Sequence, residues 1–165
     1  MKKKWNDRYS DNTFRPRVNP WVERFYELAK PGRALDIACG VGQNSLFLAK
    51  EGFLVDAVDI SDVALSQIED KNITKYCVDV ERFLFLKERY ELIICTNFLQ
   101  RALFPKIIHS LKPEGVVIYE TFTYKKEGFN PKFLLQKNEL LKAFDELEII
   151  YYEAGEKAVM AAKKV

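Results

Sequence analysis

The stretch that decides the fold covers residues 34–44 and reads Ala-Leu-Asp-Ile-Ala-Cys-Gly-Val-Gly-Gln-Asn. It begins as an apolar strand and ends as a turn around Gly40 and Gly42. Glycine accepts the positive φ of a tight turn and lets a ligand approach the backbone closely. Asp36 lies inside the predicted strand, where an unpaired carboxylate would be costly to bury. The acid therefore needs either a hydrogen-bonding partner or a role toward a ligand.

Predicted helices and strands alternate along the rest of the chain. Asn19-Pro20 is typical of a helix start. We expect helices over residues 20–30, 43–51, 62–70, 81–87, 102–111 and 138–144. We expect strands over residues 33–38, 53–58, 73–78, 92–96, 116–121, 147–152 and 158–164. Residues 153–157 would join the last two strands as a hairpin.

This alternation predicts an α/β fold, because helices that connect neighbouring strands give parallel pairing and right-handed crossovers. The strands are apolar with little polar alternation, which is typical of a sheet covered on both faces. We expect a doubly wound, seven-stranded, mostly parallel Rossmann-like sheet with a C-terminal antiparallel hairpin. Residues 18–165 would form one domain, preceded by an aperiodic arm over residues 1–17. Ligands of such sheets bind beyond the carboxyl ends of the strands.

The composition favours a packed soluble domain, with 165 residues, 48% hydrophobic residues and a formal net charge of +2. The three cysteines fall in apolar runs, which predicts reduced core residues of a cytoplasmic protein: Cys39, Cys77 and Cys95. The single histidine, His109, is expected at the surface, so we predict no metal site. No apolar run is long enough for a membrane span, and we predict no membrane partner.

Acidic residues follow the first strands of the predicted sheet. Asp59 ends the second strand and Asp79 follows the third, so both should lie with Asp36 at one rim. The dinucleotide-binding pattern Gly-x-Gly-x-x-Gly would need a third glycine at position 45, where this chain has Ser45. The rim therefore favours a ligand with hydroxyl or amino groups over one with a pyrophosphate. The alternatives are local: Asp36 bonded to backbone amides, Asp59 as a solvated cap, and Asp79 as the cap of the next helix.

Four segments together resemble the signature of class I S-adenosylmethionine-dependent methyltransferases. They are residues 36–42 (Asp-Ile-Ala-Cys-Gly-Val-Gly), 57–61 (Ala-Val-Asp-Ile-Ser), 77–80 (Cys-Val-Asp-Val) and 111–115 (Leu-Lys-Pro-Glu-Gly), where Glu114 replaces the first glycine of the family's Gly-Gly pair. Within this class the chain is most similar to small bacterial enzymes of the tellurite-resistance methyltransferase group. That likeness lies in residues 5–9, 97–101, 104–105, 119–122 and 130–135.

The resemblance implies S-adenosylmethionine as cofactor and S-adenosylhomocysteine as product. It implies that Asp36 lies under the methionine portion, that Asp59 holds the ribose hydroxyls, and that Asp79 meets the adenine amino group beside the Val80 backbone. Further cofactor-binding residues implied by the resemblance are Ala38, Cys39, Gly40, Gly42, Asn44, Ile60, Thr96, Asn97, Trp5 and Arg8.

The acceptor side is predicted from Glu120, Gln100, Arg101 and Tyr9, named as candidate catalytic residues. Methyl transfer is an in-line displacement, in which an enzyme mainly aligns the reactants and excludes water. Glu120 ends the fifth strand, and Arg101 could pair with it to order the rim. Enzymes of this group often carry His at the position of Gln100, so a general base that such a His would supply is absent here. Tyr9 would close over the cofactor with Trp5. The alternatives are a Glu120 bonded to loop amides and an arm that merely packs.

The residues after the fourth strand narrow the choice of methyl acceptor. Residues 96–99 lack the paired prolines of enzymes that methylate exocyclic amines, and Cys95-Thr96 does not match the Pro-Cys of cytosine-C5 enzymes. We therefore expect a small-molecule acceptor. The alternatives are an RNA or protein methyltransferase working with a partner, a noncatalytic cofactor-binding subunit and, last, an NAD-dependent dehydrogenase. A nucleic-acid role would need a basic, aromatic face that continues from the arm onto the body. The oligomeric state is left open.

Overall fold

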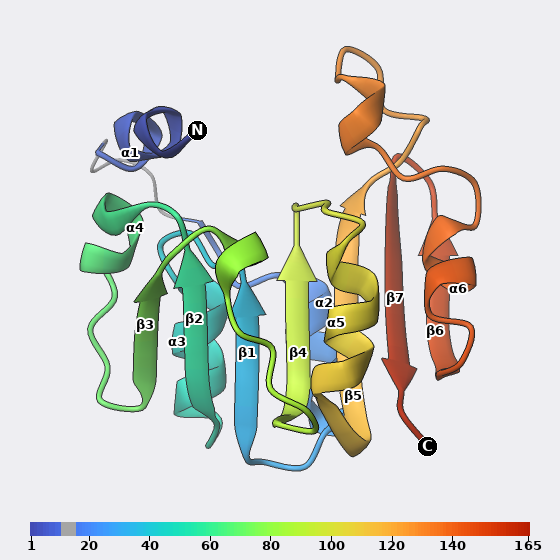
Figure 1. Cartoon of the computed structure of the whole chain (residues 1–165), viewed down its shortest axis with the longest axis horizontal. Coiled ribbons are helices and arrows are strands. Elements are labelled where there is room, and N and C mark those ends of the chain that lie inside the picture. The colour runs from blue at the N-terminus through green and yellow to red at the C-terminus, as the bar shows by residue number, and fades with distance from the viewer. Residues whose placement is uncertain (11–15) are drawn as a thin grey trace.

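The chain folds around one sheet of seven strands (Figure 1), and the computed structural model describes residues 1–10 and 16–165. The strands are β1 (Arg33–Ile37), β2 (Leu54–Asp59), β3 (Ile73–Cys77), β4 (Tyr90–Thr96), β5 (Leu111–Phe122), β6 (Glu148–Ala154) and β7 (Lys157–Lys163). The α-helices are α1 (Lys2–Tyr9), α2 (Pro20–Phe25), α3 (Gln43–Lys50), α4 (Asp62–Ser66), α5 (Leu103–Ser110) and α6 (Glu139–Ala143). Short 3₁₀ turns are η1 (Tyr26–Leu28), η2 (Val80–Arg82) and η3 (Pro131–Phe133).

The strand order is β3-β2-β1-β4-β5-β7-β6, and β7 runs antiparallel to both of its neighbours. The chain winds outward from β1 in one direction to β3 and then returns to β4 on the other side of β1. This reversal is the switch point at which ligands of doubly wound sheets bind. The predicted α/β sheet with its closing hairpin is confirmed.

Apolar residues fill both faces of the sheet. One cluster joins Leu35, Ile37 and Ile93 to α5, and the other joins Ala34, Leu92 and Ile94 to α2 and α3. Figure 1 shows α5 in front of the sheet, with α2 and α3 behind it. Neighbouring residues of β1 therefore serve opposite faces, which is why this strand lacks polar alternation. No helix in the described part of the chain is long and apolar enough to cross a membrane.

The predicted helix over residues 81–87 is wrong, because only the short turn η2 forms there. Phe85 is buried, whereas Leu84 is 73% exposed and Leu86 is 45% exposed. This alternation belongs to an extended segment, in which successive side chains point to opposite sides. Helix α4 is also shorter than expected, since it ends at Ser66 instead of residue 70.

The N-terminal arm is helical over residues 2–9, although its sequence suggests no period. None of the α1 residues is buried. The helix is held to the body through Asn6, which donates to Asp62 over 2.8 Å, and through Gln67, whose side chain donates to the Tyr9 carbonyl over 2.8 Å. The rest of the predicted arm up to residue 17 includes residues 11–15, which lie outside the described residues. Tertiary contacts therefore fix a helix that its own sequence barely specifies.

The cysteine prediction holds for two of the three residues. Cys39 and Cys95 are buried, but Cys77 is exposed at the end of β3. β3 is the outer strand of the sheet, and four of its five residues are not buried. An edge strand has one open side, so an apolar run there does not imply burial. His109 is exposed, as expected.

Candidate active site

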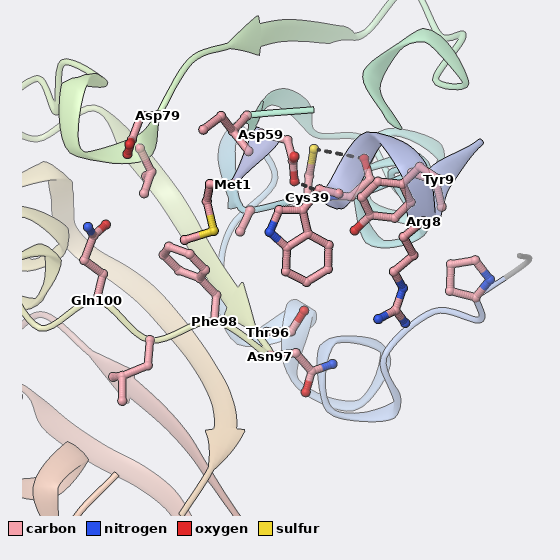
Figure 2. A pocket seen from close by; sticks show the side chains of 18 of the residues that line it. Met1, Arg8, Tyr9, Cys39, Asp59, Asp79, Thr96, Asn97, Phe98 and Gln100 are labelled. Atoms are coloured by element: carbon pink, nitrogen blue, oxygen red, sulfur yellow. Dashed lines mark hydrogen bonds between the residues drawn. The ribbon is translucent and has the colours of Figure 1, made fainter. Parts of the chain in front are cut away.

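A cavity of about 360 Å³ lies at the carboxyl ends of the inner strands, under α1. Figure 2 shows its walls, which come from the segments after β1, β2, β3 and β4. The lining residues are Met1, Trp5, Arg8, Tyr9, Pro16, Ala38, Cys39, Gly40, Val41, Gln43, Asp59, Ile60, Val78, Asp79, Val80, Thr96, Asn97, Phe98, Leu99, Gln100 and Phe133.

The turn after β1 forms the floor of the cavity. Gly40 has φ +60°, and a Cβ there would lie 2.9 Å from the Tyr9 hydroxyl. Gly42 has φ +82°, and a Cβ there would lie 2.6 Å from Cδ1 of Ile68. Gly40 therefore leaves room on the cavity side, whereas Gly42 allows close packing beneath the turn. Of the two glycines, Gly40 lines the cavity and Gly42 packs on Ile68, so a direct cofactor contact of Gly42 stays a prediction.

Asp59 joins the end of β2 to the glycine turn. Its Oδ2 accepts the Gly40 N–H over 2.9 Å, and its Oδ1 accepts the Ser61 N–H over 2.8 Å. The side chain is 9% exposed and lines the cavity. A carboxylate offers about four acceptor positions in total. Asp59 can therefore hold the turn in place and still accept hydrogen bonds from hydroxyl groups of a ligand.

Asp79 caps a turn and also lines the cavity, and its contact with an adenine amino group stays a prediction. Its Oδ1 accepts the Glu81 N–H over 3.0 Å, so it caps η2, and it also lines the cavity beside Val80.

Within the described ranges 1–10 and 16–165, no group of three or more His, Cys, Asp or Glu side chains is placed so that it could hold a metal ion.

Asp36 lies beneath the cavity and does not line it. Its Oδ2 accepts the Ser45 hydroxyl over 2.7 Å, and the side chain is 1% exposed. Burial raises the pKa of Asp36 to about 7, and the hydrogen bond from Ser45 opposes this rise. Asn44 is likewise buried, and it accepts the Asn19 N–H over 2.8 Å. Both residues support the walls from below, and a direct cofactor contact of either stays a prediction.

Glu120 and Arg101 do not lie where the sequence places them. Glu120 is buried and accepts Nδ2 of Asn19 over 2.8 Å, outside the cavity wall. Arg101 does not pair with Glu120. Its guanidinium binds Glu139 and the carbonyl oxygens of Lys132 and Leu134 over 2.5–3.0 Å. The predicted Arg101–Glu120 pair is wrong, and Arg101 instead ties down the segment after β5.

Helix α1 covers the cavity with aromatic side chains. Trp5 stacks against Tyr9 with a centroid distance of 6.0 Å. Both residues line the cavity with Met1 and Arg8 (Figure 2). Burial and the charge of Asp59 raise the pKa of Tyr9 to about 12. The phenol is therefore protonated at neutral pH and can donate a hydrogen bond, but it is a poor general base.

Two buried acceptor atoms on the cavity wall lack a hydrogen-bond donor within the described part of the chain. They are Oε1 of Gln43, at the start of α3, and Oε1 of Gln100, whose amide nitrogen is hydrogen-bonded to Glu81. Buried polar atoms normally have a partner. These oxygens therefore fit a ligand that brings N–H or O–H groups into the cavity.

Sequence reasoning missed eight lining residues: Met1, Pro16, Val41, Gln43, Val78, Phe98, Leu99 and Phe133. Gln43 could have been found, because it directly follows the glycine turn at the first position of a helix. Phe133 comes from the turn η3 far along the chain; it lies in the segment 130–135 that resembles the family, but its place in the cavity wall was not predicted.

The cavity fits S-adenosylmethionine in its chemistry. The cofactor carries ribose hydroxyls, an adenine amino group and an ammonium group, all of which are donors. The wall offers acceptors in Asp59, Asp79 and the two unpaired glutamine oxygens. Strand order, antiparallel β7, glycine turn and this acidic wall together define the class I S-adenosylmethionine-dependent methyltransferase fold.

Comparison with known proteins specifies the family. The family model described as tellurite resistance protein TehB matches residues 1–158, and the chain belongs to this family. The solved structure of TehB from Haemophilus influenzae superposes with a TM-score of 0.83 at 19% identity, covering 98% of this chain and 67% of that chain.

Curated relatives are similar over part of the chain. The putative methyltransferase YqeM of Bacillus subtilis is 29% identical over 114 residues, which is 61% of this chain and 45% of that protein. The ubiquinone biosynthesis O-methyltransferase of Coxiella burnetii is 33% identical over 118 residues, 63% of this chain and 50% of that protein. The matched regions thus make up about half the length of these relatives.

Proposed function

We propose that the chain is an S-adenosylmethionine-dependent methyltransferase that transfers the methyl group in line to a small molecule. The observation that carries this proposal is the link between Asp59 and the Gly40 N–H, which fixes an acceptor-rich wall at the switch point of the sheet. Family membership and the fold support the proposal.

Each wall of the cavity has a task in this proposal. S-adenosylmethionine, when bound, supplies a methyl group that is already activated by the sulfonium. Asp59 accepts the ribose hydroxyls, Asp79 and Val80 meet the adenine, and Gln43 accepts from the ammonium group. Asp36 positions the turn from below through Ser45. The protein then needs to align the acceptor and exclude water, since the sulfonium requires no further activation.

The acceptor is proposed to lie against the apolar wall made by Phe98, Leu99 and Phe133. Gln100 lines the cavity, and its buried, unpaired oxygen would accept a hydrogen bond from a hydroxyl or amino group of the acceptor. In the proposed mechanism Glu120 does not contact the acceptor or the cofactor. It holds Asn19 at the start of α2 and acts as a positioning residue.

A small acceptor is favoured because α1 covers the cavity, which leaves limited access for a folded macromolecule. The curated ubiquinone biosynthesis enzyme is by its name an O-methyltransferase, and a similar acceptor class is compatible with the apolar wall here. The alternatives remain an RNA or protein methyltransferase with a partner, and a noncatalytic subunit. We also propose residues 1–17 as a lid on a single domain of residues 18–165. A cytoplasmic location stays a prediction from sequence.

The test uses methyl-labelled S-adenosylmethionine with fractions of cell extract. We expect label in the small-molecule fraction with the natural chain and loss of that label with Asp59→Ala. Asp56→Asn is the matched control, because Asp56 is also a buried acid of β2 but bonds the Tyr90 hydroxyl outside the cavity. Label in RNA or protein would contradict the small-molecule proposal. No transfer despite cofactor binding would contradict the enzymatic one.

A further inference from the structure

Two segments border the mouth of the cavity at the same end of the sheet. Helix α1 contributes Trp5 and Tyr9 to the wall, and the segment after β5, residues 124–137, contributes Phe133. Figure 1 shows both rising beyond the carboxyl ends of the strands, with the inner strand ends between them. We call residues 1–9 and 124–137 the mouth surface.

The mouth surface is strongly basic. Helix α1 carries Lys2, Lys3, Lys4 and Arg8 against Asp7. The segment 124–137 carries Lys125, Lys126, Lys132 and Lys137 against Glu127. The whole chain has a formal net charge of only +2, so the remainder is net acidic. Lys2 is paired with Asp62 and Lys126 with Glu156, and the net charge of the surface stays positive with these two acids included. Such an asymmetric field orients a protein with one face toward a negatively charged surface.

The same surface exposes large apolar side chains. The exposed fractions are 77% for Met1, 53% for Tyr124, 46% for Phe129 and 47% for Phe133. Met1 and Phe133 line the cavity, and Tyr124 and Phe129 belong to the same short segment as Phe133. Gathered apolar residues with a polar rim mark interaction sites.

Lysines lie against the exposed rings of the segment 124–137. The ammonium of Lys125 is 5.9 Å from the centroid of Tyr124, that of Lys126 is 5.2 Å from Phe129, and that of Lys132 is 5.1 Å from Phe133. Lysine stems can follow an apolar surface while their charges reach a polar layer. This pairing suits the boundary between lipid headgroups and acyl chains, where aromatic rings insert and lysines meet phosphates.

A single-stranded nucleic acid fits the same residues less well. Base stacking needs open ring faces, whereas a lysine already lies over each of these rings. Phe129 is tilted by 58° against Phe122, so the two rings form no flat platform. The segment also contains no arginine, the side chain that best combines phosphate binding with stacking on bases.

We propose that the mouth surface docks on a bilayer that contains anionic lipid. The prediction of no membrane partner was based on the lack of a spanning segment, which a peripheral contact does not need. Docking would place the cavity mouth at the lipid. If the proposed methyltransferase function holds, on which this last step rests, the acceptor is a lipid-soluble molecule that enters past Phe133.

The test measures sedimentation of the full-length chain with vesicles, without cofactor, so that it is independent of methyl transfer. The vesicles contain phosphatidylcholine alone or phosphatidylcholine with phosphatidylglycerol. We expect binding to the anionic vesicles to be at least about tenfold tighter and to weaken as salt is raised. Equal binding to both vesicle types, or binding to neither, would overturn the proposal.

Paired variants separate charge from apolar insertion. Lys125→Glu with Lys132→Glu, and Tyr124→Ser with Phe129→Ser, should each weaken binding by about tenfold. The control is Lys87→Glu with Leu84→Ser, which makes the same kinds of change at exposed residues between β3 and β4, outside the mouth surface. An equal loss in the control would contradict docking at the mouth, provided that thermal unfolding shows all variants folded.

A labelled single-stranded RNA oligonucleotide is the competing probe. The proposal expects weak RNA binding that the Tyr124→Ser and Phe129→Ser changes leave unaltered. RNA binding that is tighter than vesicle binding and lost in those variants would replace the lipid surface with a nucleic acid as partner.

Discussion

At the scale of single residues, Asp59 has two tasks that can be separated by measurement. We expect Asp59→Ala to weaken S-adenosylhomocysteine binding by about 2–4 kcal/mol, or roughly 30- to 800-fold in Kd, because two charge-assisted hydrogen bonds to the ribose are lost. Because Asp59 also holds the Gly40 and Ser61 amides, the variant should lose about 1–3 kcal/mol in the free energy of unfolding. Calorimetry and urea unfolding measure the two effects.

Asp56→Asn serves as the control for the Asp59 variant. It should lower the stability of the fold and leave S-adenosylhomocysteine affinity within about twofold, since Asp56 lies outside the cavity. Unchanged affinity in Asp59→Ala would remove Asp59 from the site.

Asp36 makes stability depend on pH in an unusual direction. Burial raises its pKa from 3.8 to about 7 in the folded chain. Between these two values the folded state holds a proton that the unfolded state releases. This contribution therefore destabilises the fold progressively as pH rises from about 4 to 7, by a few kcal/mol at most. When the pH is raised from about 4 to 7, the free energy of unfolding of Asp36→Asn, measured in urea, should fall by less than that of the natural chain. Equal pH dependence in both proteins would contradict the raised pKa.

The glycine turn and the acids at the strand ends could be predicted from sequence because each is a local pattern. A glycine pair after an apolar run predicts a tight turn, and an acid at the last position of a strand predicts a carboxylate at the rim of the sheet. The partners of Glu120 and Arg101 could not be predicted this way. Asn19 is 101 residues from Glu120, and Glu139 is 38 residues from Arg101. Such pairings arise only after the sheet brings the segments together.

At the scale of elements, Arg101 fastens the segment between β5 and α6. Its guanidinium forms a bidentate ion pair with Glu139 and also donates to two backbone carbonyls. We expect Arg101→Met to lower stability by about 1–2 kcal/mol and to speed hydrogen exchange in residues 131–139, since hydrogen bonds to charged groups are among the stronger ones. Lys126→Met is the control, because Lys126 pairs with the exposed Glu156 and should cost less than about 0.5 kcal/mol. Equal effects would contradict the fastening role.

Helix α1 is one of two candidate segments for a lid over a bound ligand. It has no buried residue and is attached by polar contacts, so it is expected to open locally at little cost. We expect S-adenosylhomocysteine to raise hydrogen-exchange protection in residues 2–9, in residues 124–136, or in both. Protection of residues 40–42 alone would show that neither segment acts as a lid. A partner chain would then be the better explanation for closing the site.

The elements also show where local patterns mislead. The α1 sequence is polar and without a clear period, yet contacts with α4 stabilise it as a helix. Residues 81–87 have an apolar content that suggests a helix, yet only the turn η2 forms, and residues 83–86 continue without a helix between β3 and β4. In both segments tertiary contacts outweigh weak local preference.

At the scale of the whole molecule, alternation of strands and helices was sufficient to predict the sheet and its switch point. The parallel order follows from crossover connections and the hairpin from its turn, so neither depends on a long-range side-chain contact. The sequence suggests that the arm over residues 1–17 and the loop over residues 124–136 close the pocket, but it does not predict the shared charge and exposed apolar side chains of the cavity mouth. Its two halves lie more than 100 residues apart in the chain, and only the fold places their basic and aromatic residues around one opening.

The most direct test of a cofactor-binding methyltransferase fold is thermal unfolding of the full-length chain with two adenosine-containing ligands. S-adenosylhomocysteine at about 100 times its Kd should stabilise the native state by about 2.7 kcal/mol and raise Tm by roughly 5–10 °C. NAD at the same concentration should shift Tm by less than about 1 °C, because the wall at Asp59 and Asp79 favours donors over a pyrophosphate. A Tm that rises with NAD and stays unchanged with S-adenosylhomocysteine would contradict the account.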